Sequence, residues 1–332
     1  MLAVPAPIED PVNQADWLEA MACIAADGDV AGSDLAQYLT VAGGPQDDAS
    51  AIEALVDDAF DELQRRAREC GSQYPFDVQS TGPTALLRKR TDGTFPAYLF
   101  CLGLSLTGAD RDDADESVAV LFEKLATIAA RQYLNGEAVR FGHPREDPLP
   151  PAFAKALGQV CDRLREGCAR DPLPDHLADA KDGSVDVVAW KAVGDERPGQ
   201  LLLLGQCAAG GNWSQKLNDL QPPDFMDFFL TERFVEPVKT FFTPFRLPGG
   251  SWHLCSTKAG IVFDRCRIAR LTEGTEGELT EQESWFARQL QTFAGGGVHR
   301  PPKRHGVGRR MSRRRRRATH HSAKPRKPQT SN

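Results

Sequence analysis

Apolar side chains recur at helical spacing through the N-terminal part of the chain. Residues 14–26 place them at intervals of three and four, which predicts a helix. The same pattern predicts a short helix beginning at Ser33 and a longer one over 50–70. Residues 74–78 and 85–90 follow as two short extended runs on either side of a Gly-Pro turn, which predicts a hairpin.

These elements predict a mainly helical N-terminal module over residues 1–110. Three helices and a hairpin suit a winged-helix-like arrangement, in which the basic segment 88–90 could contact phosphate. The alternative is a helical packing module with an exposed basic strand end. Residues 96–106 are apolar almost throughout, so periodicity does not decide between a strand and a buried helix.

The part of the chain over 111–296 alternates helical and extended patterns. A helix with an apolar stripe is expected over 115–134, and a Gly- and Pro-rich connecting loop over 136–150. Further helices are expected at 152–166, 212–220, 225–234 and 281–294. Extended segments are expected at 184–192, 200–208, 239–247 and 260–271. This order predicts an α/β domain with a mixed central sheet flanked by helices.

The charge of the chain is unevenly distributed. The 332 residues carry a net charge of −6, yet the stretch from Arg300 to the last residue contains 13 Lys and Arg and no Asp or Glu. The rest of the chain holds 27 basic and 46 acidic residues, a net charge of −19. The sequence therefore predicts an acidic body and a disordered Arg-rich tail over 297–332 that would bind polyanions.

The cysteines and the hydropathy pattern bear on the compartment. The eight cysteines are scattered without a C-x-x-C pair, which predicts reduced thiols and argues against a zinc site. No stretch reaches the ~18 apolar residues that a membrane helix needs. The first residues show neither a basic start nor an apolar run, so no secretory signal is expected. We therefore expect a cytoplasmic protein with no membrane association.

Polar side chains stand at the ends of two of the expected strands. Asp186 lies at the head of one strand, and Gln206 ends the other, after a run of four leucines. A buried strand that delivers polar groups only at its end is typical of a functional site built over an apolar core.

These residues resemble the core of the PD-(D/E)xK nucleases, the restriction-endonuclease-like fold, and especially its Mrr-type branch. The segment 182–186, DGSVD, resembles the family's strand opening, and Gln206 stands where the second motif begins. Glu123, on the preceding helix, is the counterpart of the family's helical acid. The sequence departs from the motif at Ala208, where the family has a lysine; Lys216 or Lys191 is left to supply that ammonium group.

The resemblance, which covers about 115–275, implies a metal-dependent nuclease. Mg²⁺ or Mn²⁺ would be held by Asp186, Glu123 and Gln206, and a lysine would stabilise the charge of the phosphate. It implies nucleic acid, most naturally DNA, as the partner, a role in defence against foreign DNA, and either a homodimer or partner proteins of a defence system.

Two other interpretations remain open. One is a catalytically inactive subunit of the same fold that binds nucleic acid or a partner protein. The other is an unrelated scaffold in which Asp186 caps a turn and Gln206 is a buried amide satisfied by the backbone.

Overall fold

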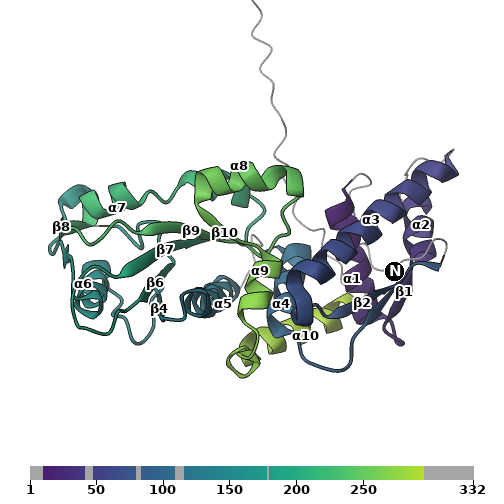
Figure 1. The fold of residues 1–332 in the computed structure, drawn as a ribbon, viewed down its shortest axis with the longest axis horizontal. Helices are drawn as coiled ribbons and strands as arrows, with labels where there is room; N and C mark the ends of the chain where they lie inside the picture. The colour runs from purple at the N-terminus through teal and green to yellow at the C-terminus, as the bar shows by residue number, and fades with distance from the viewer. Residues whose placement is uncertain (1–9, 42–47, 80–83, 109–115, 178, 295–332) are drawn as a thin grey trace, which may run out of the picture.

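A sheet and a helical region lie side by side in the computed structural model (Figure 1). The structure describes residues 10–41, 48–79, 84–108, 116–177 and 179–294. The tail expected over 297–332 lies outside the described residues. The described part confirms a mixed α/β protein with a central sheet flanked by helices.

The helical region contains α1 (Pro11–Ile24), α2 (Gly32–Val41), α3 (Ala49–Cys70) and a three-stranded antiparallel sheet. Its strands are β1 (Asp29–Ala31), β2 (Phe76–Gln79) and β3 (Leu86–Lys89), in the order β1-β3-β2. The expected hairpin is β2 and β3; β1 was not expected. The side chains of Asp10 and Asp48 accept backbone N–H groups at the starts of α1 and α3.

The basic strand end, for which a phosphate contact was one of two alternatives, is largely paired within the protein. Arg88 donates to Asp29 at 2.7 Å, and Arg90 donates to Asp92 at 2.9 Å. These ion pairs favour the packing-module interpretation of this surface over a phosphate contact.

The apolar segment 96–106 is a buried helix, α4 (Pro96–Thr107). Opposite sides of α4 join two different apolar cores. Tyr98 and Leu102 pack with α1 and α3, whereas Phe100 and Leu104 pack with α5 (Glu116–Leu134) and α10 (Thr280–Ala294). A helix covered on all sides carries no amphipathic period, which is why the sequence pattern was ambiguous.

The central sheet has five strands in the order β10-β9-β7-β6-β4. They are β4 (Glu137–Arg140), β6 (Val187–Lys191), β7 (Leu201–Cys207), β9 (Val238–Phe242) and β10 (Ile261–Phe263). Strand β6 is antiparallel to both β4 and β7, whereas β9 and β10 run parallel to β7. A two-stranded sheet pairs β5 (Cys168–Ala169) with β8 (Leu230–Glu232).

Three of the sequence expectations for this region were wrong. The helix expected at 225–234 ends at Phe229 and is followed by strand β8. The segment 136–150 was expected to be a connecting loop, but it begins with β4, the edge strand of the sheet. The segment 260–271 was expected to be one strand. Its first part is the short strand β10, and the rest forms helix α9 (Arg265–Leu271). Asp264 causes the switch because its side chain accepts the N–H of Arg267 as a helix N-cap.

Alternate residues of β6 and β7 enter different apolar cores, as strand geometry requires. Ala189 and Leu203 face α5, whereas Trp190 and Leu204 face α6 (Phe153–Leu164) and α7 (Pro222–Phe229). Helix α8 (Gly249–Ala259) covers the parallel strands together with the 3₁₀ turn Trp213–Asn218. Helices thus cover both faces of the sheet, and polar groups can gather only at its ends.

Packing is continuous across the boundary expected at residue 110. Arg265 of α9 is fully buried and donates to Asp16 of α1 at 2.8 Å and to Ser105 of α4 at 2.6 Å. Arg66 of α3 is also fully buried and donates to Asp16 and Glu19, each at 2.8 Å. Buried charges that satisfy each other in this way connect the helical region to the end of the central sheet.

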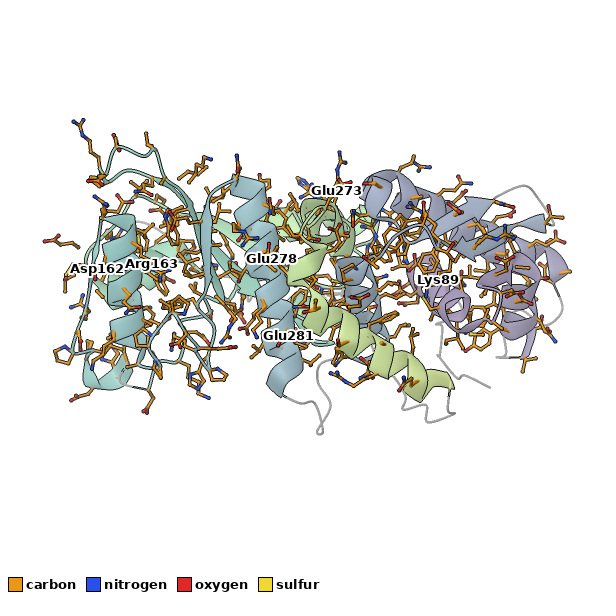
Figure 2. The ribbon with its side chains drawn as sticks, turned by 90° about the horizontal axis from the view of Figure 1, so that it is seen from below. Lys89, Asp162, Arg163, Glu273, Glu278 and Glu281 are labelled. Carbon is orange, nitrogen blue, oxygen red and sulfur yellow. A yellow bond between two sulfur atoms is a disulfide. The ribbon has the colours of Figure 1, made fainter. Side chains whose placement is uncertain are left out.

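The C-terminal helix α10 and the 3₁₀ turn that precedes it, Glu276–Glu278, are connected to α5 by surface ion pairs. Arg131 donates to Glu278 at 2.7 Å, and Lys124 donates to Glu281 at 3.1 Å. Figure 2 shows Glu278 and Glu281 beside α5. No described helix has the length and apolarity needed to span a bilayer.

The expectation of reduced thiols was wrong for one pair of cysteines. Cys70, at the end of α3, and Cys266, in α9, form a disulfide across a sequence separation of 196 residues. Such a distant pair leaves no local spacing signal in the sequence, because only the packing of α9 on α3 brings the two residues together. The other six cysteines are free.

Candidate active site

Asp186 and Gln206 lie at the same end of the central sheet. The pairing of β6 with β7 places Val187 opposite Gly205, and the N–H of Asp186 donates to the Gly205 carbonyl at 2.8 Å. The Asp186 Oδ2 atom accepts the N–H of Cys207 at 2.7 Å. The backbone of β7 therefore holds the Asp186 carboxylate beside Gln206.

Gln206 is almost fully buried, with 5% of its surface exposed. Its Oε1 atom has no hydrogen-bond partner among the described residues. An unpaired buried amide oxygen is unfavourable by roughly 1–3 kcal/mol, so this atom is a ready acceptor for a cation, a water molecule or a ligand donor.

Glu123 reaches the same place from α5. Its Oε2 accepts the guanidinium of Arg140, the last residue of β4, at 2.6 Å. Gly142 lies directly against this carboxylate, and a Cβ atom at that position would overlap it. The backbone N–H of Gly142 also donates to the Asp186 carbonyl at 3.1 Å. The turn after β4 thus fixes Glu123 relative to Asp186.

The two candidate lysines lie at different ends of the sheet. Lys216, in the 3₁₀ turn after β7, lines the cavity that contains Asp186, and its charge acts on the Asp186 carboxylate. Lys191 ends β6 opposite Leu201, and its Nζ donates to the carbonyl of Asn135. The structure does not bring Lys191 to the cavity.

The cavity has a volume of about 360 Å³ and is strongly acidic. Glu123, Asp182, Asp186 and Asp219 line it, with Lys216 as the cation. Burial raises the pKa of Asp186 to about 8, with a further contribution from the charge of Glu123. Burial also raises the pKa of Glu123, although the Arg140 guanidinium opposes this. Near neutral pH these neighbouring carboxylates therefore favour retention of a proton, and a divalent cation would take the place of that proton.

The donor set can be tested against a hard divalent ion. Asp186 and Gln206 present a carboxylate oxygen and an unpaired amide oxygen, which are ligands that Mg²⁺ accepts. Glu123 is already engaged by Arg140. Among the described residues no three His, Cys, Asp or Glu side chains form a group that could hold a metal ion. Asp186 and Gln206 therefore fit the ion, and Glu123 would have to share its carboxylate with Arg140.

Sequence reasoning missed three polar groups of this site. Asp182, whose carboxylate accepts the N–H of Ser184 at 2.9 Å, was noted only as part of the strand opening. Arg140 lies in a segment expected to be a loop, and no pattern singled it out. Asp219 follows Lys216 by one helical turn and lines the same cavity, a spacing that the sequence does show.

No protein-family model matches this chain, and neither the curated proteins nor the solved structures include one that is significantly similar to it.

Proposed function

We propose that the protein is a metal-dependent nuclease that hydrolyses phosphodiester bonds at the cavity formed by Asp186, Gln206, Glu123 and Lys216. The observation that carries the proposal is the convergence of these four side chains, from two strands, one helix and one turn, on a single cavity. A restriction-endonuclease-like fold, with nucleic acid as the partner, follows from the resemblance of 182–206 to that family.

The roles of the side chains follow from their chemistry. Bound Mg²⁺ or Mn²⁺ would supply a Lewis acid for the phosphate and lower the pKa of the attacking water. Asp186 and Gln206 provide oxygen atoms on adjacent strands, and Asp186 holds a proton near neutral pH when no cation replaces it. The ammonium group of Lys216 stabilises negative charge that develops on the phosphate.

The surroundings of Ala208, where the family has its motif lysine, favour a second candidate function. Ala208 is fully buried and packs with Trp213, Leu217 and Phe241 in an apolar cluster. The side chain at 208 therefore points away from the cavity, and a lysine there would need a different local structure. If Lys216 does not replace that amine, the protein is an inactive subunit that binds nucleic acid or a partner protein.

The helical region offers little support for a DNA contact through α3. The exposed face of this helix is acidic, with Glu53, Asp57, Asp58 and Asp61 in solvent. A row of carboxylates repels the phosphate backbone. The proposal therefore places the nucleic acid at the end of the central sheet.

The test is cleavage of DNA and RNA substrates by the purified chain with Mg²⁺ or Mn²⁺. We expect metal-stimulated cleavage that Asp186→Asn abolishes and that Lys216→Gln slows by roughly 10²-fold or more, as loss of a charge-stabilising group does. Lys191→Gln is the matched control, because Lys191 lies at the other end of β6, and it should cleave normally.

Cleavage that is equal in Asp186→Asn and the unmodified chain would contradict the assigned site. Metal-dependent binding of nucleic acid without any cleavage would favour the inactive subunit.

A further inference from the structure

A second cavity, of about 460 Å³, lies beside the candidate active site. It is formed by the turn after β4, the N-terminus of α6 and residues 171–173 and 179–181. Lys181 lines this cavity, and its chain neighbour Asp182 lines the active-site cavity. The two cavities are therefore lined by adjacent residues of the chain.

Arg145 is a buried cation in this cavity without a carboxylate partner. It is 8% exposed, and its guanidinium donates to the backbone carbonyls of Pro151 and Lys181. It also lies over the rings of Phe141 and Phe153, at 4.7 and 5.4 Å from their centroids. No described carboxylate forms an ion pair with it, and its Nε–H group has no hydrogen-bond partner among the described residues.

This arrangement is unusual because a buried charge normally has a partner of opposite sign. Burial lowers the pKa of Arg145, and the charge of Asp182 opposes this shift. An anion in the cavity would supply the missing negative charge beside the guanidinium group. Guanidinium groups bind phosphate oxygens in this way, through several donors of one planar group.

The N-terminus of α6 faces the same cavity. The helix begins at Phe153 after Ala152, whose side chain cannot cap it, and Ala152, Phe153 and Ala154 all line the cavity. The first N–H groups of a helix lack intrahelical acceptors, and the helix dipole favours an anion at this end. The helix end and Arg145 are thus two independent groups of donors around one space.

The rim of the cavity carries both signs of charge. His143 and Lys181 are exposed at the rim, and so are Asp171 and Asp179. Solvent screens the two exposed carboxylates. The buried guanidinium acts from a medium of lower dielectric constant, where its attraction for an anion is stronger.

We propose that this cavity binds a phosphate group, and that in the working protein this is a phosphate of the nucleic-acid strand adjacent to the one being cleaved. The second part of the proposal rests on the proposed function; the first part does not. The cavity would hold the strand on one side of Asp182 while the reacting phosphate lies on the other.

The test compares two isosteric variants at the helix N-cap, Ala152→Asn and Ala152→Asp. Both side chains cap a helix about equally well, so both variants should fold at least as stably as the unmodified chain. Only Asp adds a negative charge to the cavity. We expect inorganic phosphate, titrated into the full chain by calorimetry or followed by its phosphorus NMR signal, to bind Ala152→Asp about tenfold more weakly than Ala152→Asn, which corresponds to about 1.4 kcal/mol.

Arg145→Gln provides a second measurement and should lose phosphate binding. Equal phosphate affinity in the two Ala152 variants would overturn the phosphate site, whether or not Arg145→Gln folds.

A short single-stranded oligodeoxynucleotide, bound without added metal and followed by fluorescence anisotropy, distinguishes the two sources of phosphate. The assignment to a strand phosphate requires that Ala152→Asp also weaken this binding relative to Ala152→Asn. If inorganic phosphate is affected and the oligonucleotide is not, the site takes a free anion and the strand assignment is overturned. If the phosphate difference appears in a chain that cleaves no nucleic acid, the proposed function fails while the phosphate site stands.

Discussion

Replacement of Asp186 by Asn should make the fold more stable above neutral pH. Burial and the charge of Glu123 raise the pKa of Asp186 to about 8 from an ordinary value of 3.8. Between these two pH values the folded state holds a proton that the unfolded chain releases. The stability of the unmodified protein therefore falls as the pH rises through this window and is lowest above pH 8.

The magnitude follows from the size of this difference. At about 1.4 kcal/mol per pKa unit, a pKa of about 8 against 3.8 gives an upper limit of about 6 kcal/mol. Asp186 is half-buried and faces Lys216, so screening should reduce the observed effect to roughly 2–4 kcal/mol. The Asn variant keeps an oxygen that can accept the Cys207 N–H but carries no charge.

The assay is urea unfolding of both proteins from pH 5 to pH 9 without divalent metal. We expect the Asn variant to be slightly more stable at pH 5 and the difference to grow as the pH rises to 9. Asp175→Asn, at an exposed carboxylate outside the cavity, is the control and should follow the unmodified protein. Parallel curves for Asp186→Asn and the unmodified protein would refute the argument that the cavity destabilises the Asp186 charge.

Three further substitutions test the packing around the site. Gly142→Ala should lower the free energy of unfolding by about 1–3 kcal/mol, because its Cβ overlaps the Glu123 carboxylate; an unchanged urea midpoint would contradict this. Arg265→Ala should cost about 3–5 kcal/mol, because it removes one of the two buried guanidinium groups that pair with the carboxylates of α1 and leaves only Arg66; a thermal midpoint equal to that of the unmodified protein would argue against the buried cluster. Cys70→Ser, which removes the disulfide with Cys266, should lower stability by about 2–4 kcal/mol. Reductant should reproduce that loss in the unmodified chain and leave the variant unchanged; insensitivity of both to reductant would contradict the bond.

The sequence could predict the strands that carry the site because their side chains are buried on both faces. The leucine run of β7 and the apolar run of β6 are unambiguous, and Asp186 and Gln206 follow from them as polar strand ends. The sequence pattern could not decide whether Lys191 or Lys216 supplies the ammonium group of the site. Lys191 is nearer in sequence to Asp186 than Lys216 is, but strand direction carries it to the far end of β6.

The parts that could not be predicted depend on tertiary contacts. Strand β4 has only four residues and polar ends, so nothing in its sequence distinguishes it from a loop until it pairs with β6. For that reason the sequence did not indicate that Arg140 belongs to the site. The end of β10 was predictable in principle, because Asp264 is a good helix N-cap. However, arginines and apolar residues alternate around it in a pattern that resembles the polar and apolar alternation of a strand.

The most direct measurement is a calorimetric titration of the full chain with Mn²⁺ near pH 7, performed in two buffers of different ionisation enthalpy. We expect one ion to bind per chain with release of a proton, because Asp186 is largely protonated at that pH. Binding and proton release should both be absent in Asp186→Asn and weakened in Gln206→Met, while Lys191→Gln should behave as the unmodified protein does. The absence of binding, or binding that survives Asp186→Asn unchanged, would contradict the assignment of this cavity as a metal-dependent active site.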